Sequence, residues 1–592
     1  MSLIAELKRR KVFKVGAAYL VVAWLLIQVV STVAPQLNLP EWAPRLITFV
    51  LLLGFPVALV LAWIFDATPD GVRVDAAPVG NKRMFAIAAV LAALAVGWYW
   101  KGRPESADAG AEARSIAVLP FVNMSGEADN EYFSDGISEE ILNVLARTPD
   151  LRVAARTSSF AYKGQAKEIP DIARELEVRM VLEGSVRRQG ERVRITAQLI
   201  DASNGFHLWS QTYDRDLKDI FAIQDEIAQA IAKELDVKMG GASAPGAAAA
   251  PTAETDLATY DLYLKGLTLW QARGAANLYE AERLFRAALG RDPGFAKAWA
   301  GLALTHAVLP EWSTEKHEVS YPIARDAAEH ALALDPALPE PYAVLASIAT
   351  GENRIPTSRA MFQRAIAIAP SYATALQWWG ESLMFTGDLE EALEVTARAM
   401  ALDPKSAVVR NAHVNALWQS GRDDEAMSLC TAILADAPDF APCRLYRYSA
   451  ALVRRDYPLA RQLLHALAQP RGAEAVRFAD AMSTVLEAGP GGSAEAGAVA
   501  ARLAELPDGY LDDRVLTPLG GSDMVLWFMA IGRNDLAVQR IERMAETLPQ
   551  LARWAMADAH VDPLRCEPGF RALAQRLGFD DRRAATQCDK GK

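Results

Sequence analysis

The sequence has few of the residues that most often carry metal or nucleophilic chemistry. Its 592 residues include four cysteines and seven histidines, and no two histidines have the spacing of a zinc-binding helix such as HExxH. The stretch EKHE at 315–318 is the best remaining metal candidate, and a polar insertion is its simpler interpretation. The glycine-rich stretch 489–492 has no following lysine, so it does not match a phosphate-binding loop. We find no nucleophile motif, and the sequence predicts no metal, no cofactor and no enzyme.

The sequence also lacks the positive charge that nucleic-acid binding requires. Its formal net charge is −11, with a balance of +6 over residues 1–104 and −17 over the remainder. An acidic soluble part repels nucleic acid over long distances. We therefore expect no DNA or RNA partner.

Uncharged stretches are plentiful near the N-terminus. Three hydrophobic runs cover residues 15–34, 46–65 and 84–100. A helix rises about 1.5 Å per residue, so a run of about 20 residues crosses the roughly 30 Å hydrocarbon core of a bilayer. The runs predict a membrane domain over residues 15–100, with three transmembrane helices and the lipid bilayer as a partner.

Basic residues beside these runs predict an orientation. Five lysines and arginines precede the first run and three lie between the second and third, whereas only Arg45 lies between the first and second. The positive-inside rule then places the N-terminus, residues 1–14, in the cytoplasm. Three crossings predict a bacterial inner-membrane protein with periplasmic soluble domains. A cleaved signal peptide is the alternative for the first run, although Pro35 directly follows the candidate cleavage site.

An α/β domain is predicted over residues 114–238, after a small, polar linker at 101–113. It opens with an apolar run, a polar loop and a helical pattern. The loop contains one glycine and four carboxylates, which would repel a phosphate. Alternating apolar and polar residues on both sides of Gln189 and Gly190 predict a hairpin. We expect strands at 115–121, 151–156, 179–188, 192–201 and 205–214, and helices at 138–146, 169–176 and 217–237.

Several motifs in this region carry a family resemblance. The stretches IAVLPFVNMSG, YFSDGISEEI, RTSSF, VLEGSVRR and VRITAQLIDASNGFHLWSQTYDR occur in this order. They resemble the domain of bacterial membrane proteins that is similar to the amino-terminal domain of TolB. The resemblance implies an α/β module without established catalysis, often set between a membrane anchor and helical repeats. Some members carry a cyclase, kinase or winged-helix domain before the anchor, but only 14 residues precede the first run here.

A repeat array follows an Ala/Gly/Pro-rich linker at 239–255. Prolines recur from Pro293 to Pro470 with gaps of 43, 34, 34, 34 and 32 residues. A period of 34 residues is typical of tetratricopeptide repeats, which we predict over residues 256–470. Within one unit, Gly380 is expected to let two helices approach closely. The pattern weakens over residues 471–592, where we expect divergent helical repeats and a C-terminal cap.

Stacked repeats form a superhelix with a concave face. Polar and aromatic residues on the first helices fall at exposed inner positions, and we predict that they bind a partner protein or peptide. A solvated helix face is the alternative interpretation. The candidate residues are Lys297, Glu340, Gln377, Glu381, Asn411, Asn415 and Trp418.

The four cysteines, Cys430, Cys443, Cys566 and Cys588, all lie in the C-terminal part of the chain. An oxidising periplasm permits two disulfides, Cys430 with Cys443 and Cys566 with Cys588. Four buried free thiols are the other interpretation, and the sequence does not choose between them.

The predicted fold class is multi-domain, with three transmembrane helices, a mixed-sheet α/β domain and an all-α repeat superhelix. The predicted function is a non-enzymatic, inner-membrane-anchored scaffold or sensor that binds envelope proteins. One alternative is a transmembrane signalling component that relays periplasmic binding to a cytoplasmic partner. The other is an enzyme, cyclase-like by family association alone.

Overall fold

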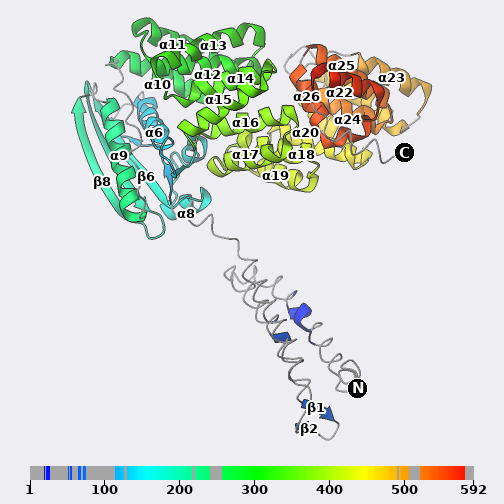
Figure 1. Cartoon of the computed structure of the whole chain (residues 1–592), viewed down its shortest axis with the longest axis horizontal. Helices are drawn as coiled ribbons and strands as arrows, with labels where there is room; N and C mark the ends of the chain where they lie inside the picture. The colour runs from blue at the N-terminus through cyan, green and yellow to red at the C-terminus, as the bar shows by residue number, and fades with distance from the viewer. Residues whose placement is uncertain are drawn as a thin grey trace. The chain divides into compact units, whose positions relative to one another are not determined.

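The computed structural model describes residues 114–125, 130–216, 220–239, 256–489, 492–505, 521–547 and 549–579, with short stretches between residues 19 and 74 (Figure 1). The chain divides into two compact units, Met1–Gly110 and Ala111–Lys592. In the first unit, strand β1 (Phe65–Thr68) pairs with strand β2 (Gly71–Val74) as an antiparallel hairpin. The second unit contains the sheet domain and the helical array.

The predicted fold class is wrong in its membrane part. Among the described residues, no helix is both long enough and apolar enough to cross a membrane. Most of the runs 15–34 and 46–65, and all of the run 84–100, lie outside the described residues. Phe65, which ends the second run, begins strand β1 and is not helical. A mostly helical superhelix and a small mixed sheet replace the predicted three-part architecture.

The second unit begins with a mixed sheet in the order β5-β3-β6-β7-β8, and β4 also pairs with β6. Strand β3 is parallel to β5 and β6, whereas β7 is antiparallel to β6 and β8. The predicted hairpin is confirmed, because β6 and β7 pair along their full length around a turn in which Gly190 has a φ of 61°. The strands are β3 (Ser115–Val118), β4 (Val122–Asn123), β5 (Arg152–Val153), β6 (Met180–Gln189), β7 (Arg192–Asp201) and β8 (Phe206–Asp216).

Helices cover both faces of the sheet at its parallel edge. Val118 and Leu182 belong to a core shared with helices α6 and α9. Their neighbours Ala117 and Val181 point the other way, into a core shared with α8. Successive strand residues face opposite sides, so strands buried on both faces read as the continuous apolar run seen in the sequence. The helices are α6 (Glu131–Leu145), α7 (Arg156–Phe160), α8 (Ile169–Glu175) and α9 (Ile220–Met239).

Helix α6 begins at Glu131, earlier than the predicted start at Ser138. Acidic residues of the predicted loop therefore lie in the first helical turns, where the helix dipole favours negative charge. Lys163 Nζ lies 2.8 Å from Glu131 Oε1 and 2.6 Å from Asp135 Oδ1. This cation balances the carboxylates and lets the helix extend.

The helical array consists of antiparallel helix pairs. A Cβ at Gly380 would clash with Thr396 of the next helix, so this glycine permits the predicted close approach. Gly387 ends its helix in the left-handed conformation, with a φ of 79°. The helices are α10 (Leu257–Ala272), α11 (Ala275–Arg291), α12 (Ala296–Trp312), α13 (His317–Leu334), α14 (Pro339–Gly351), α15 (Ile355–Ile368), α16 (Ala373–Thr386), α17 (Leu389–Leu402), α18 (Ala407–Gln419), α19 (Asp423–Asp436), α20 (Ala441–Val453) and α21 (Tyr457–Ala468).

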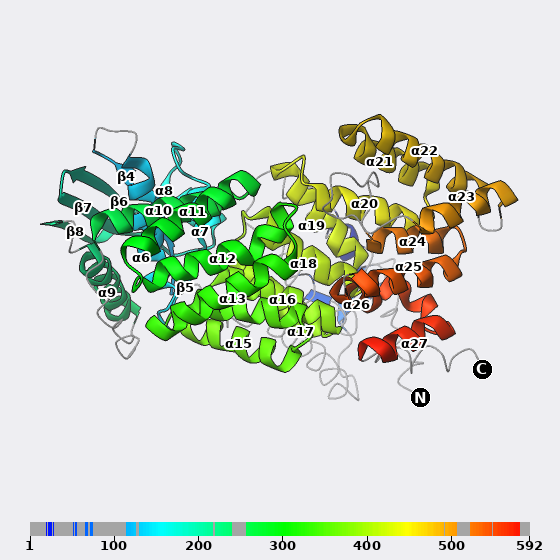
Figure 2. The same cartoon turned by 90° about the horizontal axis from the view of Figure 1, so that it is seen from above.

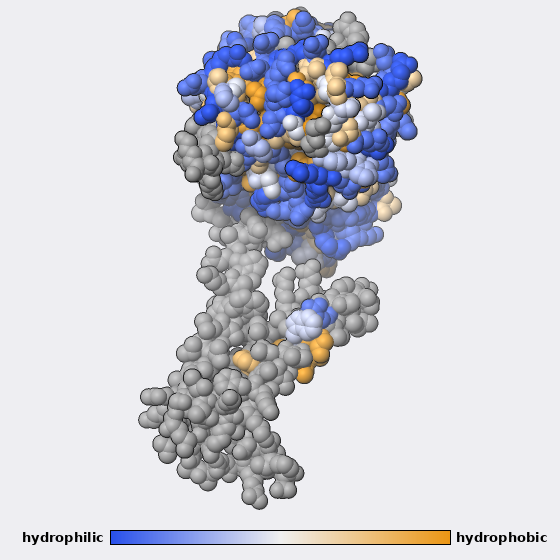
Figure 3. All heavy atoms as spheres, turned by 90° about the vertical axis from the view of Figure 1, so that its right-hand side faces the viewer, coloured by the Kyte–Doolittle hydropathy of each residue, from blue (hydrophilic) through white to orange (hydrophobic). Residues whose placement is uncertain are grey.

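Helices beyond residue 470 extend the array and then turn back on it (Figure 2). Helix α26 packs on α16, and the 3-10 helix η4 packs on α18. The face at this end of the array is mostly hydrophilic, with scattered hydrophobic residues (Figure 3), as expected of a capping end. These elements are α22 (Ala473–Ala488), α23 (Ala494–Ala504), α24 (Gly521–Ala530), α25 (Asn534–Thr547), α26 (Pro549–Ala557), η4 (Ala559–Leu564) and α27 (Pro568–Leu577).

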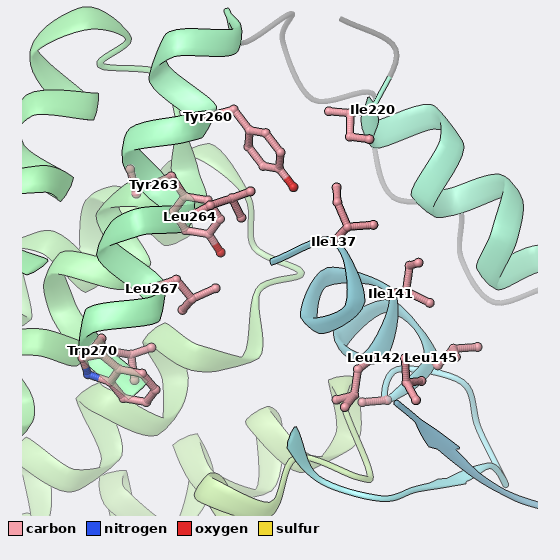
Figure 4. Close-up of a cluster of buried hydrophobic side chains, with 14 of the residues drawn as sticks. Ile137, Ile141, Leu142, Leu145, Ile220, Tyr260, Tyr263, Leu264, Leu267 and Trp270 are labelled. Atoms are coloured by element: carbon pink, nitrogen blue, oxygen red, sulfur yellow. The ribbon is translucent and has the colours of Figure 1, made fainter. Parts of the chain in front are cut away.

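The α/β domain packs directly on the first helices of the array. One hydrophobic core continues from the sheet through α6 and α9 into α10, α11 and α12. In Figure 4, Ile137 of α6 lies between Tyr260 of α10 and Ile220 of α9, and Ile141 lies on the side of α6 that faces α9. Because the core is continuous, the sheet domain and the first repeats form one packed body.

Candidate functional site

A cavity of about 480 Å³ lies where the α/β domain meets the array. Its walls come from α6, α7 and α9 on one side and from α10, α12, α14 and α16 on the other. Small-molecule sites typically have volumes of about 300–1,000 Å³ and often lie at domain interfaces. The cavity is therefore the leading candidate site in the described part of the chain.

Two adjacent carboxylates of α6 form part of the cavity wall. Glu140, with a side chain only 2% exposed, makes an ion pair with Lys297 of α12 and accepts a hydrogen bond of 2.9 Å from the Tyr263 hydroxyl. Glu139 Oε2 lies 2.8 Å from Arg156 Nε. Burial raises the pKa of Glu139, and the charge of Arg156 opposes that rise. Each buried carboxylate thus has a cationic partner, without which its burial would be strongly unfavourable.

The close approach of α6 to α10 depends on Gly136. A Cβ at this position would lie 2.7 Å from Cδ2 of Leu264, so a larger residue would push the two helices apart. Arg188 of β6 donates hydrogen bonds of 3.0 and 3.1 Å to the two carboxylate oxygens of Asp261 on α10. This bidentate geometry fixes the orientation of the two domains as well as their separation.

Turns between successive repeats form a second group of contacts between the array and the α/β domain. The Ser158 hydroxyl of α7 donates a hydrogen bond of 2.6 Å to Asp403. The Ser371 hydroxyl accepts a hydrogen bond of 3.1 Å from the backbone N–H of Val153 in β5. Burial raises the pKa of Asp403 to about 6, although the hydrogen bonds from Ser158 oppose the rise. The α/β domain therefore contacts two consecutive repeat junctions as well as the inner helices.

Three polar atoms on the cavity wall have neither a hydrogen-bond partner nor an ion-pair partner among the residues that the structure describes. They are Nε of Arg147, Nε1 of Trp270 and Oε2 of Glu340, and we call them the unsatisfied atoms. Trp270 is 5% exposed. Leaving a buried polar group unpaired costs about 1–3 kcal/mol, so such groups mark places where a ligand or water is expected.

The charges on the cavity wall are unbalanced toward the negative. Burial raises the pKa of Glu340, and Arg147 opposes this rise whereas Glu140 adds to it. Burial likewise raises the pKa of Asp225, with Lys297 and Arg147 opposing. The carboxyl groups on the wall are Glu139, Glu140, Asp225, Asp335, Glu340 and Asp403, and the cationic side chains are Arg147, Arg156 and Lys297.

The predicted partner-binding residues do not form one open face. Lys297 is paired with Glu140 of the α/β domain, and Glu340 lines the cavity. Gln377 is buried and donates a hydrogen bond of 3.0 Å to Glu381. Burial raises the pKa of Glu381 to about 7. The prediction that these inner positions are exposed is wrong for Gln377, because the inner helices are covered by other parts of the chain.

Trp418 is also buried, at 3% exposed. Its indole N–H donates a hydrogen bond of 3.1 Å to Asp558, and its ring stacks on His560 with a centroid distance of 4.1 Å. Both partners belong to the C-terminal segment that turns back on the array. The predicted exposure of Trp418 is therefore wrong, since this segment covers it.

Asn411 and Asn415 lie half-buried on the same helix, α18. Asn415 accepts a hydrogen bond of 2.8 Å from the Tyr446 hydroxyl. The side-chain oxygen of Asn411 is buried, and no described residue bonds to it. A role for either residue in partner binding stays a prediction.

A disulfide joins Cys430 of α19 to Cys443 of α20, with a Cα–Cα distance of 5.2 Å. It links the second helix of one repeat to the first helix of the next. Cys588 lies outside the described residues, so its predicted pairing with Cys566 stays a prediction. Within the described residues, no three His, Cys, Asp or Glu side chains are arranged to hold a metal.

Sequence reasoning missed the α6 residues that hold the interface. Glu139 and Glu140 looked like ordinary polar positions of an amphipathic helix. A signal was nevertheless present, because Glu140 follows Ile137 by three residues and therefore lies on the apolar face. A carboxylate on a buried face requires a cation, and that requirement indicates a contact beyond the helix itself.

Two family models match this chain. Residues 112–230 match the second domain of HilA/YgeH-like transcriptional regulators. Residues 383–447 match the tetratricopeptide repeat. The prediction of tetratricopeptide repeats is confirmed. The resemblance to the amino-terminal domain of TolB stays a prediction.

One curated relative shares a long segment with the chain. It is "Putative adenylate cyclase 3" of Rhizobium meliloti (strain 1021), which is 45% identical over 190 residues. The match covers 32% of this chain and 32% of the relative. The chain thus spans about a third of the length of this relative.

Solved structures of two other proteins are also similar. The tetratricopeptide protein TTC0263 of Thermus thermophilus is 22% identical, with a TM-score of 0.28, covering 32% of this chain and 97% of that one. The pilF protein of Pseudomonas aeruginosa is 18% identical, with a TM-score of 0.30, covering 38% of this chain and 97% of that one.

We expect Lys297→Met to lower the free energy of unfolding of the second unit by about 3–5 kcal/mol, because it leaves the buried charge of Glu140 without its cation. Chemical denaturation followed by circular dichroism measures the change. Adding Glu140→Gln should restore most of the loss, since position 140 then has no charge that needs a cation. A double variant as unstable as the single one would contradict this account of the interface.

We expect the C-terminal segment to lose stability as the pH rises from about 6.5 to about 10. Burial alone would lower the pKa of His560, but hydrogen bonds to Asp423 and Asp558 outweigh it and raise the pKa to about 10. A raised folded-state pKa stabilises the fold fully below the unfolded value of about 6.5, and deprotonation above it removes that stability, at about 1.4 kcal/mol per pKa unit. Thermal melting across this range should show a decline in the wild type that His560→Gln flattens. The exposed His207→Gln serves as the control, and a wild-type decline that persists in His560→Gln would contradict the assignment.

Proposed function

We propose that the protein is a non-enzymatic scaffold or sensor that binds partner proteins, and that its array binds its own α/β domain when no partner is present. The observation that carries this proposal is the position of Lys297 and Glu340. Both lie at inner positions of the array, where a repeat protein would contact a partner, and both face the α/β domain or the cavity beside it. Tetratricopeptide arrays commonly bind proteins or peptides, which supports the same role here.

Beside the hydrophobic core that the two domains share, the interface has a polar part whose contacts a partner can replace. Its contacts include Glu140 with Lys297 and Arg188 with Asp261, next to a cavity with unsatisfied atoms. Interfaces between domains of one chain resemble transient protein interfaces, which are more polar than permanent ones. A partner that supplies equivalent charges therefore competes with the α/β domain. The match to a regulator family over residues 112–230 supports a regulatory setting for such exchange.

A variant that separates the α/β domain from the array tests this proposal. Gly136→Leu should separate α6 from α10, because overpacking costs about 1–3 kcal/mol, and should raise hydrogen–deuterium exchange in both helices about tenfold. Cross-linking in cells, read by mass spectrometry, should then recover more of a specific protein partner with the variant than with the wild type. Gly290→Ala, where a Cβ meets nothing within 4 Å, is the matched control. Faster exchange without any gain in partner would overturn the proposal, and so would conversion of ATP to a cyclic nucleotide by the purified wild-type chain.

We further propose that the array works in an oxidising compartment, such as the bacterial periplasm. Structural disulfides persist in such compartments and are rare in the cytosol, and Cys430 and Cys443 form one. Cells are quenched in acid, denatured and treated with an alkylating reagent before and after reduction. We expect peptides containing Cys430 and Cys443 to be labelled only after reduction. Full labelling without reductant would instead place the array in a reducing compartment and favour a cytoplasmic signalling role.

A further inference from the structure

The cavity between the α/β domain and the array has the features of a built ligand site. It holds about 480 Å³ and receives walls from both domains. Three polar atoms on its wall are unsatisfied among the described residues, and one of them belongs to Trp270, which is 5% exposed. Buried polar groups are otherwise paired, so these three atoms require partners, which a ligand or bound water supplies.

The unsatisfied atoms define what a ligand must offer. Arg147 Nε and Trp270 Nε1 are hydrogen-bond donors, so they require an acceptor such as a carboxylate or carbonyl oxygen. Glu340 Oε2 is an acceptor, and it requires a donor. One molecule that satisfies all three atoms must carry both kinds of group.

The charge of the cavity wall indicates which kind of hydrogen-bond donor suits a ligand. The wall has more carboxyl groups than cationic side chains, and within the described part of the chain neither Asp225 nor Glu340 forms an ion pair of its own. A cationic nitrogen beside either carboxylate would offset its repulsion from Glu140. A protonated amine is a donor that suits this wall.

Part of the wall is apolar. Leu142 of α6, Leu267 of α10 and Leu304 of α12 contribute to it, so one part of the ligand lies against aliphatic side chains. Burial of apolar surface contributes about 25 cal/mol per Å² to binding. An aliphatic side chain on the ligand suits this part of the wall.

We infer that the cavity binds a small zwitterion of the amino-acid class, either a free α-amino acid or a dipeptide with an apolar side chain. Its carboxylate or carbonyl oxygen accepts hydrogen bonds from Arg147 and Trp270, and its ammonium group binds Glu340. Because the ligand contacts both domains, it stabilises their closed arrangement by mass action. The link between this stabilisation and sensing rests on the proposed function, whereas the binding of the zwitterion does not.

Isothermal titration of the full chain with matched probes tests the inference. The probes are L-leucine, the dipeptide Gly-Leu, 4-methylpentanoate, which lacks the amine of leucine, and 3-methylbutylamine, which lacks its carboxylate. We expect at least one zwitterion to bind, and each single-charge analogue of leucine to bind about tenfold or more weakly than leucine, because hydrogen bonds to charged groups contribute about 1.5–3 kcal/mol.

Substitutions on the cavity wall test whether the zwitterion binds in the cavity. Glu340→Gln and Trp270→Phe should each weaken the zwitterion about tenfold, whereas Glu390→Gln, on the exposed side of α17, should leave binding unchanged. Circular dichroism confirms that each variant is folded. Absence of zwitterion binding at millimolar concentration, equal binding of the amine alone, or binding insensitive to both cavity variants would overturn the inference. Binding without any change in partner capture would leave the site in place and contradict only the proposed sensing role.

Discussion

The second unit depends on the burial of two adjacent carboxylates on α6. Removing a charge from water is unfavourable unless an opposite charge and hydrogen bonds replace the lost solvent. Glu139 finds Arg156 within the α/β domain, but Glu140 finds Lys297 only on the second repeat hairpin. The sheet domain therefore cannot bury this helix by itself. The hydrophobic effect drives the two domains together, and the placement of this charge pair selects how they meet.

The need to pair buried charges also explains why a cavity remains between the α/β domain and the array. Carboxylates on facing helices repel one another, and the two domains together place more of them on the cavity wall than the cations there can neutralise. Tight packing around Gly136 and Leu264 gives way, one helical turn further on, to a cavity bordered by polar groups. Close packing and incomplete charge compensation thus occur side by side on one helix. The close packing stabilises the interface, and the incomplete charge compensation leaves a polar cavity beside it.

The sequence predicted the repeats, the hairpin and the sheet domain because each has a local signal. The 34-residue period, Gly380 and the alternation on both sides of Gly190 are properties of neighbouring residues. It did not predict which surfaces the domains share, since that depends on residues far apart in the chain. Trp418 was expected at an open inner position, and no local pattern shows that Asp558, 140 residues later, covers it. The predicted membrane runs failed as part of the fold class for a different reason: hydropathy alone defined them, and Phe65 lies in a strand.

Helix α16 lies at the meeting point of both ends of the second unit. Its N-terminal residues line the cavity beside the α/β domain, and helix α26 packs on it from the C-terminal segment. In a repeat array each unit normally contacts only its neighbours. Here an added hairpin before or after α16 would rotate one of these two partners away from it. The number of repeats on each side of α16 therefore decides whether both contacts can form.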